Sequence, residues 1–226
     1  MPTIRRRLLH RIAYVRRNRC SALLVALCLL ILLNPLFVGS RAGTTSIIFG
    51  LYAVLMLAVW ALRVGRRMIW AAAFLAFIAV DAVLLDLGGQ PVRPLMLAGT
   101  ALFTGVVTVA LLRYVLDWHP IKTDKVFGAV AAYVLIAFTF ASLFALLQLV
   151  EPGAFRDTTR GGGDGVLGWP TLMYFSFTVL TSTGFGEIIP LSNMARSLIV
   201  IEQVLGVMYV AFLVARLANL YGTVSK

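Results

Sequence analysis

The chain has 226 residues, of which 61% are hydrophobic and 13% are charged, and its formal net charge is +11. No aqueous globular core needs so large an apolar share, so the composition excludes a water-soluble enzyme or binding domain and indicates a membrane protein. Cys20 and Cys28 do not form a disulfide framework, because eight residues along one helix separate them by about 12 Å.

Residues 1–20 form a basic segment that we expect on the cytoplasmic side of the membrane. Apolar residues recur there at helical spacing with arginines between them, so residues 3–19 predict an amphipathic helix on the anionic lipids of the inner leaflet. A basic tail that only sets the topology is an equal alternative. The positive charge is spread along one side of the membrane, which favours lipid headgroups over nucleic acid as the partner. The apolar residues of the pattern are Ile4, Leu8, Leu9, Ile12 and Val15.

Six apolar stretches are near the length needed to cross about 30 Å of hydrocarbon. We therefore predict an all-α membrane protein with six transmembrane helices. A four-helix domain covers 21–116, a cytoplasmic connector covers 117–125, and a two-span domain covers 126–226. A secretory signal peptide is disfavoured for the first stretch, because that stretch exceeds the usual apolar length of about 7–15 residues. The stretches are 21–39, 45–62, 69–87, 94–116, 126–150 and 194–221.

Lysine and arginine residues predict the orientation of the spans. With a cytoplasmic amino terminus, fourteen of the 20 Lys and Arg residues lie inside, four lie outside, and two lie near the ends of the sixth span. We therefore expect a multi-pass protein of the inner (cytoplasmic) membrane with both termini in the cytoplasm.

Charged residues within the predicted spans are few, and each is a functional candidate by default. Asp81 in the third span and Glu202 in the sixth are candidate buried carboxylates, with either a functional or a packing role. The fourth span carries no Lys or Arg between Leu95 and Leu112, so we expect weak or absent voltage gating. An intramembrane hydrolase built on such carboxylates, including Asp86, is disfavoured because no G-x-G-D-like aspartyl pair appears in the predicted spans, and we predict no enzymatic activity.

The most specific motif lies between the fifth and sixth spans, where residues 178–190 read T-V-L-T-S-T-G-F-G-E-I-I-P. Residues 169–177 precede it as W-P-T-L-M-Y-F-S-F, with a proline placed for a first helical turn. The helix expected over about 170–181 is too short to cross the membrane, and the polar loop after it is tolerated there only along a water-filled path inside protein. Gly184 and Gly186 can adopt positive φ at low cost, so successive carbonyl oxygens can be aimed at one axis and replace the water shell of a cation.

Residues 170–190 resemble the pore loop of the potassium channel superfamily, whose usual filter is T-V-G-Y-G followed by Asp. Ser182 stands for the usual Thr and keeps a hydroxyl, Thr183 replaces Val or Ile, Phe185 replaces Tyr, and Glu187 replaces Asp. None of these changes removes a carbonyl oxygen. The six-span layout is similar to the bacterial six-transmembrane potassium channel family, with the first four spans in the place of a voltage sensor but without its arginines.

The resemblance implies a selectivity filter, K⁺ as the permeant ion, no cofactor, and a homotetramer, because one loop per chain needs four copies to close a cage. We expect no cytosolic ligand-binding domain in this chain. The implied ion-binding residues are Ser182, Thr183, Gly184, Phe185 and Gly186, the first four being the potassium ligands. The other implied positions are Glu187 at the outer mouth, Tyr174, Phe175, Thr178 and Thr181 in the pore helix, and Gly206, Val207, Val210, Val214 and Ala218 at the hinge and inner cavity.

Two alternatives to a potassium-selective channel stay open. A weakly selective monovalent cation channel is the nearest, because Thr183 and Phe185 change the packing of the filter. A non-conducting structural membrane subunit belongs to a different class. Outside the membrane, residues 151–168 are rich in Gly and charge and are expected to form a flexible turret.

Overall fold

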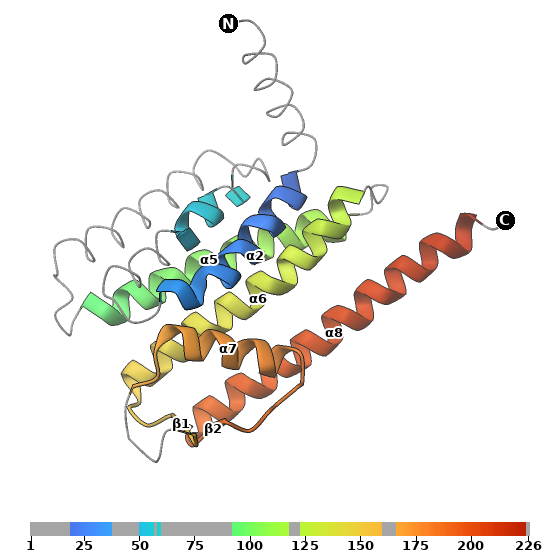
Figure 1. Ribbon diagram of the computed structural model, residues 1–226. Helices are drawn as coiled ribbons and strands as arrows, with labels where there is room; N and C mark the ends of the chain where they lie inside the picture. Colours follow the sequence, from blue (N-terminus) through green and yellow to red (C-terminus); the bar gives the residue numbers. More distant parts are fainter. Residues whose placement is uncertain are drawn as a thin grey trace, which may run out of the picture. The chain divides into compact units, whose positions relative to one another are not determined.

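The computed structural model describes residues 19–37, 50–56, 58–59, 92–117, 123–159 and 166–224 (Figure 1). The third predicted span with Asp81 and Asp86, and most of the predicted amino-terminal amphipathic helix, lie outside these residues. Residues 50–56 are helical. The named elements are α2 (Arg19–Phe37), α5 (Val92–Leu116), α6 (Thr123–Val150), β1 (Phe155–Asp157), α7 (Trp169–Leu180), β2 (Ile188–Pro190) and α8 (Asn193–Val224).

Long apolar helices account for most of the described chain. Three of them are long and apolar enough to cross a membrane, at Leu97–Leu116, Asp124–Val150 and Asn193–Arg216, and Arg19–Asn34 is a shorter apolar helix. The bounds of α2, α5, α6 and α8 differ from the predicted spans by at most three residues. A mainly helical membrane protein is thereby confirmed, whereas the number of six spans stays a prediction.

The chain divides into two compact units, one of residues 1–87 with 103–135 and the other of residues 88–102 with 136–226. In the first unit, the backbone N–H of Cys20 donates to Asp124 Oδ1 at 2.9 Å, and the rings of Tyr52 and Phe103 stack with centroids 6.0 Å apart. Cys20 and Cys28 are both free thiols, as predicted.

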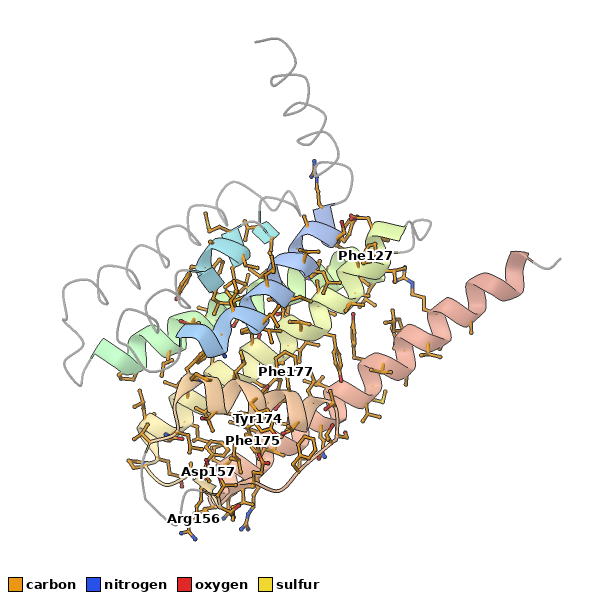
Figure 2. The ribbon with its side chains drawn as sticks, viewed as in Figure 1. Phe127, Arg156, Asp157, Tyr174, Phe175 and Phe177 are labelled. Atoms are coloured by element: carbon orange, nitrogen blue, oxygen red, sulfur yellow. The ribbon has the colours of Figure 1, made fainter. Side chains whose placement is uncertain are left out.

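Three phenylalanine rings form a buried cluster in the second unit. The Phe144 ring lies 5.2 Å from that of Phe155 and 5.5 Å from that of Phe175, and the latter two rings are 5.6 Å apart. Figure 2 shows Phe175 on α7 above the β1 segment. Buried aromatic pairs stabilise a fold by more than the burial of their apolar area alone. This cluster therefore holds three elements together, namely the carboxyl-terminal part of α6, the strand β1 and the helix α7.

β1 and β2 form a small antiparallel sheet. Phe155 lies opposite Pro190 and Asp157 opposite Ile188, and the ladder continues where the N–H of Leu191 donates to the Ala154 carbonyl at 2.8 Å. The prediction of a flexible turret is therefore wrong for residues 155–157, which a composition rich in Gly and charge did not reveal as a strand.

α7 lies alongside α8 in the second unit (Figure 1). It begins after Gly168, has a proline in its first turn, and ends at Leu180 with Thr181 as the C-cap. α8 buries one stripe of residues, with Ala195, Glu202 and Gly206 at its centre, at the seven- and four-residue spacing of one helix face. Most of its large apolar side chains outside this stripe are exposed in the single chain.

Candidate functional site

Residues 181–187, which we call the glycine loop, fold back onto the end of α7. The Thr178 carbonyl accepts two hydrogen bonds, from the N–H of Thr183 at 2.9 Å and from that of Gly184 at 3.3 Å. The loop thus satisfies a carbonyl that the end of a helix leaves without a partner. In a trans peptide the C=O points opposite to the N–H of the next residue, so the carbonyls of Ser182 and Thr183 point away from α7.

The backbone φ angles of the glycine loop alternate between the left-handed and right-handed regions. Ser182, Gly184 and Gly186 have φ of 55°, 54° and 84°, whereas Thr183 and Phe185 are not among the residues with positive φ. Alternation of right- and left-handed angles collects successive N–H groups on one side of a chain, and therefore collects the carbonyls on the other. The positive φ predicted at both glycines is confirmed. The positive φ of Ser182 was not predicted, because a serine in this region of backbone angles is uncommon.

The carbonyl oxygens of the loop are left without protein donors. Among the hydrogen bonds of the described residues, none ends on a carbonyl oxygen of residues 182–186, and all five of these residues are exposed in the single chain. Strong acceptors usually find a partner in a folded protein. A row of unpaired carbonyls facing one way is therefore a ready set of ligands for a cation.

A chain of hydroxyl groups ties Thr183 to α7. Thr181 Oγ1 donates to the Phe177 carbonyl at 2.7 Å and lies 2.8 Å from Thr183 Oγ1. A hydroxyl has one proton, and that of Thr181 is used on Phe177, so Thr183 is the donor between the two threonines. Thr183 thus gains a link to α7 that Val or Ile at this position cannot make.

The carboxyl-terminal end of the glycine loop is held from two sides. The backbone N–H and the hydroxyl of Thr158 both donate to the Glu187 carbonyl, at 2.8 and 2.9 Å. The Tyr174 and Phe185 rings stack in parallel with centroids 6.3 Å apart, and Figure 2 shows Tyr174 on α7. Partial desolvation, and then a hydrogen bond with the Glu187 carboxylate, raise the pKa of the Tyr174 hydroxyl, which stays protonated at neutral pH.

The buried stripe of α8 meets the carboxyl-terminal half of α7. A Cβ added at Gly206 would overlap the Leu180 carbonyl oxygen and lie 3.1 Å from its carbon, so only glycine allows this approach. One turn earlier, Glu202 is fully buried, and its Oε1 lies 2.5 Å from Ser176 Oγ on α7. Ser176 Oγ also lies 2.8 Å from the Ala137 carbonyl of α6.

Residues 130–222, from α6 through the glycine loop to α8, match the model of a protein family described as ion channel. This part of the chain is therefore similar to that ion-channel family. No curated protein and no solved structure shows significant similarity to the chain. The family match and the apolar helices together indicate a membrane protein.

The matched region, residues 130–222, contains every predicted site residue except Asp81. The structure brings Tyr174, Phe185 and Glu187 together, and it buries Phe175, Thr178 and Glu202. Along α8, Val207, Val210, Val214 and Ala218 are exposed in the single chain.

Three participants were missed from the sequence, namely Thr158, Ser176 and Ala137. Each acts through a partner at least 26 residues away in the chain. Spacing along one sequence carries no signal of such pairs.

Proposed function

We propose that four copies of the chain form a potassium-selective channel that conducts K⁺ passively across the cytoplasmic membrane. The observation that carries this proposal is the glycine loop, whose alternating φ at Ser182, Gly184 and Gly186 leaves carbonyls aimed away from α7. Stacked rings of such oxygens can replace the water shell of a dehydrated K⁺. One loop supplies one side of each ring, so a closed cage needs further copies around an axis.

In this assembly the selectivity filter uses the carbonyls of Ser182, Thr183, Gly184 and Phe185, and the Ser182 hydroxyl adds an oxygen at its inner end. Gly186 supplies the last positive φ, and Glu187 forms a ring of negative charge at the outer mouth. The hydrogen bonds of the loop to the Thr178 carbonyl, and the link from Thr183 through Thr181 to the Phe177 carbonyl, support this arrangement.

The exposed faces of α8 supply the rest of the path. Val207, Val210, Val214 and Ala218 would line an apolar inner cavity, and their exposure in one chain leaves them available for it. Gly206 is the proposed hinge, although its contact with Leu180 supports a packing role for this glycine equally well. The channel requires no catalytic group and no cofactor, and its lipid partners are the anionic headgroups of the inner leaflet.

We expect conduction to depend weakly on voltage. Steep dependence takes about 3–4 gating charges per subunit, and α5, which coincides with the fourth predicted span, carries only Arg93 and Arg113 near its two ends. Planar-bilayer recordings over a wide voltage range measure this directly, and a conductance as steep as that of channels with arginine-rich sensors would contradict it.

A weakly selective cation channel is the second candidate, and one observation favours it. Phe185 brings no hydroxyl, so its contact with Tyr174 is a ring stack and not a hydrogen bond. A stack fixes the spacing of a loop less tightly than a directional bond. Potassium and sodium competition distinguishes the two candidates.

The test is ion flux from the purified full chain in liposomes. We expect a K⁺ gradient to drive flux and a Na⁺ gradient alone to drive little. Gly184→Ala is the control, because a Cβ at φ 54° is strained wherever it points; it should abolish flux while the oligomer persists on a sizing column. Equal Na⁺ and K⁺ flux would overturn the selectivity, and absence of any flux would overturn the channel itself.

A further inference from the structure

Glu202 is a carboxyl group in a place where a charge is poorly tolerated. It lies on the buried stripe of α8 with 0% of its surface exposed. Its Oε1 contacts Ser176 Oγ, and its Oε2 has no hydrogen-bond partner within the described part of the chain. Such an unpartnered buried oxygen needs an explanation, and neither the ion path nor the glycine loop uses it directly.

The protons around Ser176 can be counted. Ser176 Oγ lies 2.8 Å from the Ala137 carbonyl and 2.5 Å from Glu202 Oε1, so two contacts of hydrogen-bond length meet at one hydroxyl. A serine hydroxyl supplies one proton, and a carbonyl or an ionised carboxylate supplies none. If Ser176 donates to Ala137, the second proton can come only from Glu202. A length of 2.5 Å also suits a hydroxyl donating to a carboxylate, but the Ala137 contact would then hold no proton.

The neighbouring helices offer no counter-charge to an ionised Glu202. α7 has no acidic or basic residue, and its one phenol, Tyr174, contacts Glu187. In α6 the charged residues are confined to the first turn, and its phenol is Tyr133. Phenols are neutral at neutral pH. On α8 itself the other charged or titratable groups are Arg196, Tyr209, Arg216 and Tyr221, which stand six or more residues away. A lone buried charge is strongly unfavourable.

We propose that Glu202 is a protonated positioning residue of the ion path, whose proton links α8 through Ser176 to α6 behind the glycine loop. The proposal rests on the proposed channel function. Ser176 stands two residues before Thr178, whose carbonyl receives the N–H groups of the loop. When the proton is lost, two acceptors compete for the single proton of Ser176 and a charge is left buried. α7 then moves relative to α8, and the loop carbonyls lose their common aim.

The first test compares K⁺ flux from liposomes at neutral and alkaline pH. Wild-type flux should fall about tenfold or more per pH unit once Glu202 ionises, because one unit changes the neutral fraction about tenfold. Glu202→Gln is neutral at every pH and its amide donates to Ser176, so it should stay within about twofold of neutral wild type and lose the alkaline fall. Glu202→Leu keeps the bulk without a donor and should lose flux about tenfold at all pH values. Ser176→Ala should behave like Glu202→Leu.

Two results would overturn the positioning role. One is an alkaline fall that persists in Glu202→Gln, which would assign the titration to another group. The other is Glu202→Leu with wild-type flux at all pH values, which would leave the carboxyl without a role.

A second measurement does not depend on conduction. The infrared difference spectrum between wild type and Glu202→Gln at neutral pH should contain the C=O band of one protonated carboxyl, and the spectrum between wild type and Glu187→Gln should contain a carboxylate band instead. If the wild type conducts but its spectrum lacks the protonated band at Glu202, the proposed protonation is wrong and the proposed channel function still holds. A protonated band in a chain that conducts no ion defeats the channel and leaves the protonation assignment intact.

Discussion

α6 and α8 are two long helices of similar apolar composition that are buried to very different extents. Within a single chain, 61% of the most apolar window of α6 is buried, against 11% for α8. α6 achieves this with small residues, since Ala131, Ala137 and Ala141 have no exposed surface, and small residues let helices approach closely. α8 buries one narrow stripe. Two helices of nearly equal hydropathy therefore have different roles. α6 makes most of its contacts within one chain, whereas α8 leaves most of its surface free for contacts outside the chain.

The two helices also use glycine differently, and this difference gives the largest effect on ion flux that we expect from the comparison. Gly206→Ala on α8 forces a Cβ against the Leu180 carbonyl, and backbone cannot yield as a side chain does. We expect ion flux to fall at least about tenfold and stability to drop by about 1–3 kcal/mol, as for overpacked cores. Liposome flux and denaturant unfolding measure the two effects.

Gly128→Ala on α6 is the matched control. Its Cβ would lie 3.2 Å from Cys20 Sγ and 3.3 Å from Val115 Cγ2, which are side-chain atoms that can shift. Flux should stay within about twofold of wild type, because the better helix propensity of alanine offsets about 1 kcal/mol of crowding. Equal losses in both variants would remove the distinction between the two glycines.

A pair of phenylalanines tests the burial difference itself. Phe144 on α6 is fully buried in the aromatic cluster, whereas Phe212 on α8 is 52% exposed. Phe144→Ala should lower the free energy of unfolding of the chain by about 3–5 kcal/mol in any state of assembly. Phe212→Ala should change that of the separated chain by about 0.5 kcal/mol or less and weaken only the assembled form. Unfolding followed by circular dichroism on separated and assembled fractions decides between them, and an equal loss in the separated chain would refute the contrast.

The clamp between β1 and the glycine loop gives a smaller effect. Thr158→Val removes the hydroxyl bond to the Glu187 carbonyl and keeps the backbone bond. A net loss of about 1 kcal/mol should make currents decay roughly fivefold faster at low external K⁺. Thr159→Val is the control, because its hydroxyl bonds to Asp157 at 2.6 Å and not to the loop. Equal decay in both variants would show that the clamp does not support the loop.

The smallest effect concerns surface charge at Glu187. Glu187→Gln should reduce single-channel conductance about twofold at low salt, because the carboxylate attracts cations. The deficit should vanish near 1 M salt, where the Debye length is about 3 Å. Glu151→Gln, an exposed carboxylate after the end of α6, should have little effect at either salt concentration. A deficit at Glu187 that ignores salt would indicate structural damage to the loop.

The difference between local and distant contacts also explains which features of the fold and of the site could be predicted from the sequence. Hydrophobic runs and a proline in a first turn predicted α6, α7 and α8 to within three residues, because these signals act within a few turns of helix. The residue type alone predicted the positive φ of Gly184 and Gly186. Glu202 could be named as a candidate buried carboxylate from its position within the sixth predicted span.

Contacts between distant residues could not be found in this way. The Thr158 and Glu187 bond spans 29 residues and the Ser176 and Ala137 bond spans 39. The positive φ of Ser182 depends on both the residues before it and the glycine after it. The packing of Gly206 depends on where α7 ends, so composition alone left it undecided between hinge and contact.

The unpaired carbonyls of the glycine loop bear on the order of events during biosynthesis. In hydrocarbon, a backbone group without a partner costs several kcal/mol, and residues 182–186 carry five such carbonyls in one chain. In the proposed tetramer, a newly inserted single chain should therefore keep this loop in contact with water until the other three chains associate with it. A cysteine introduced at Phe185 should react with a water-soluble maleimide soon after synthesis. Its labelling rate should fall as chains associate, so this rate would measure the progress of assembly.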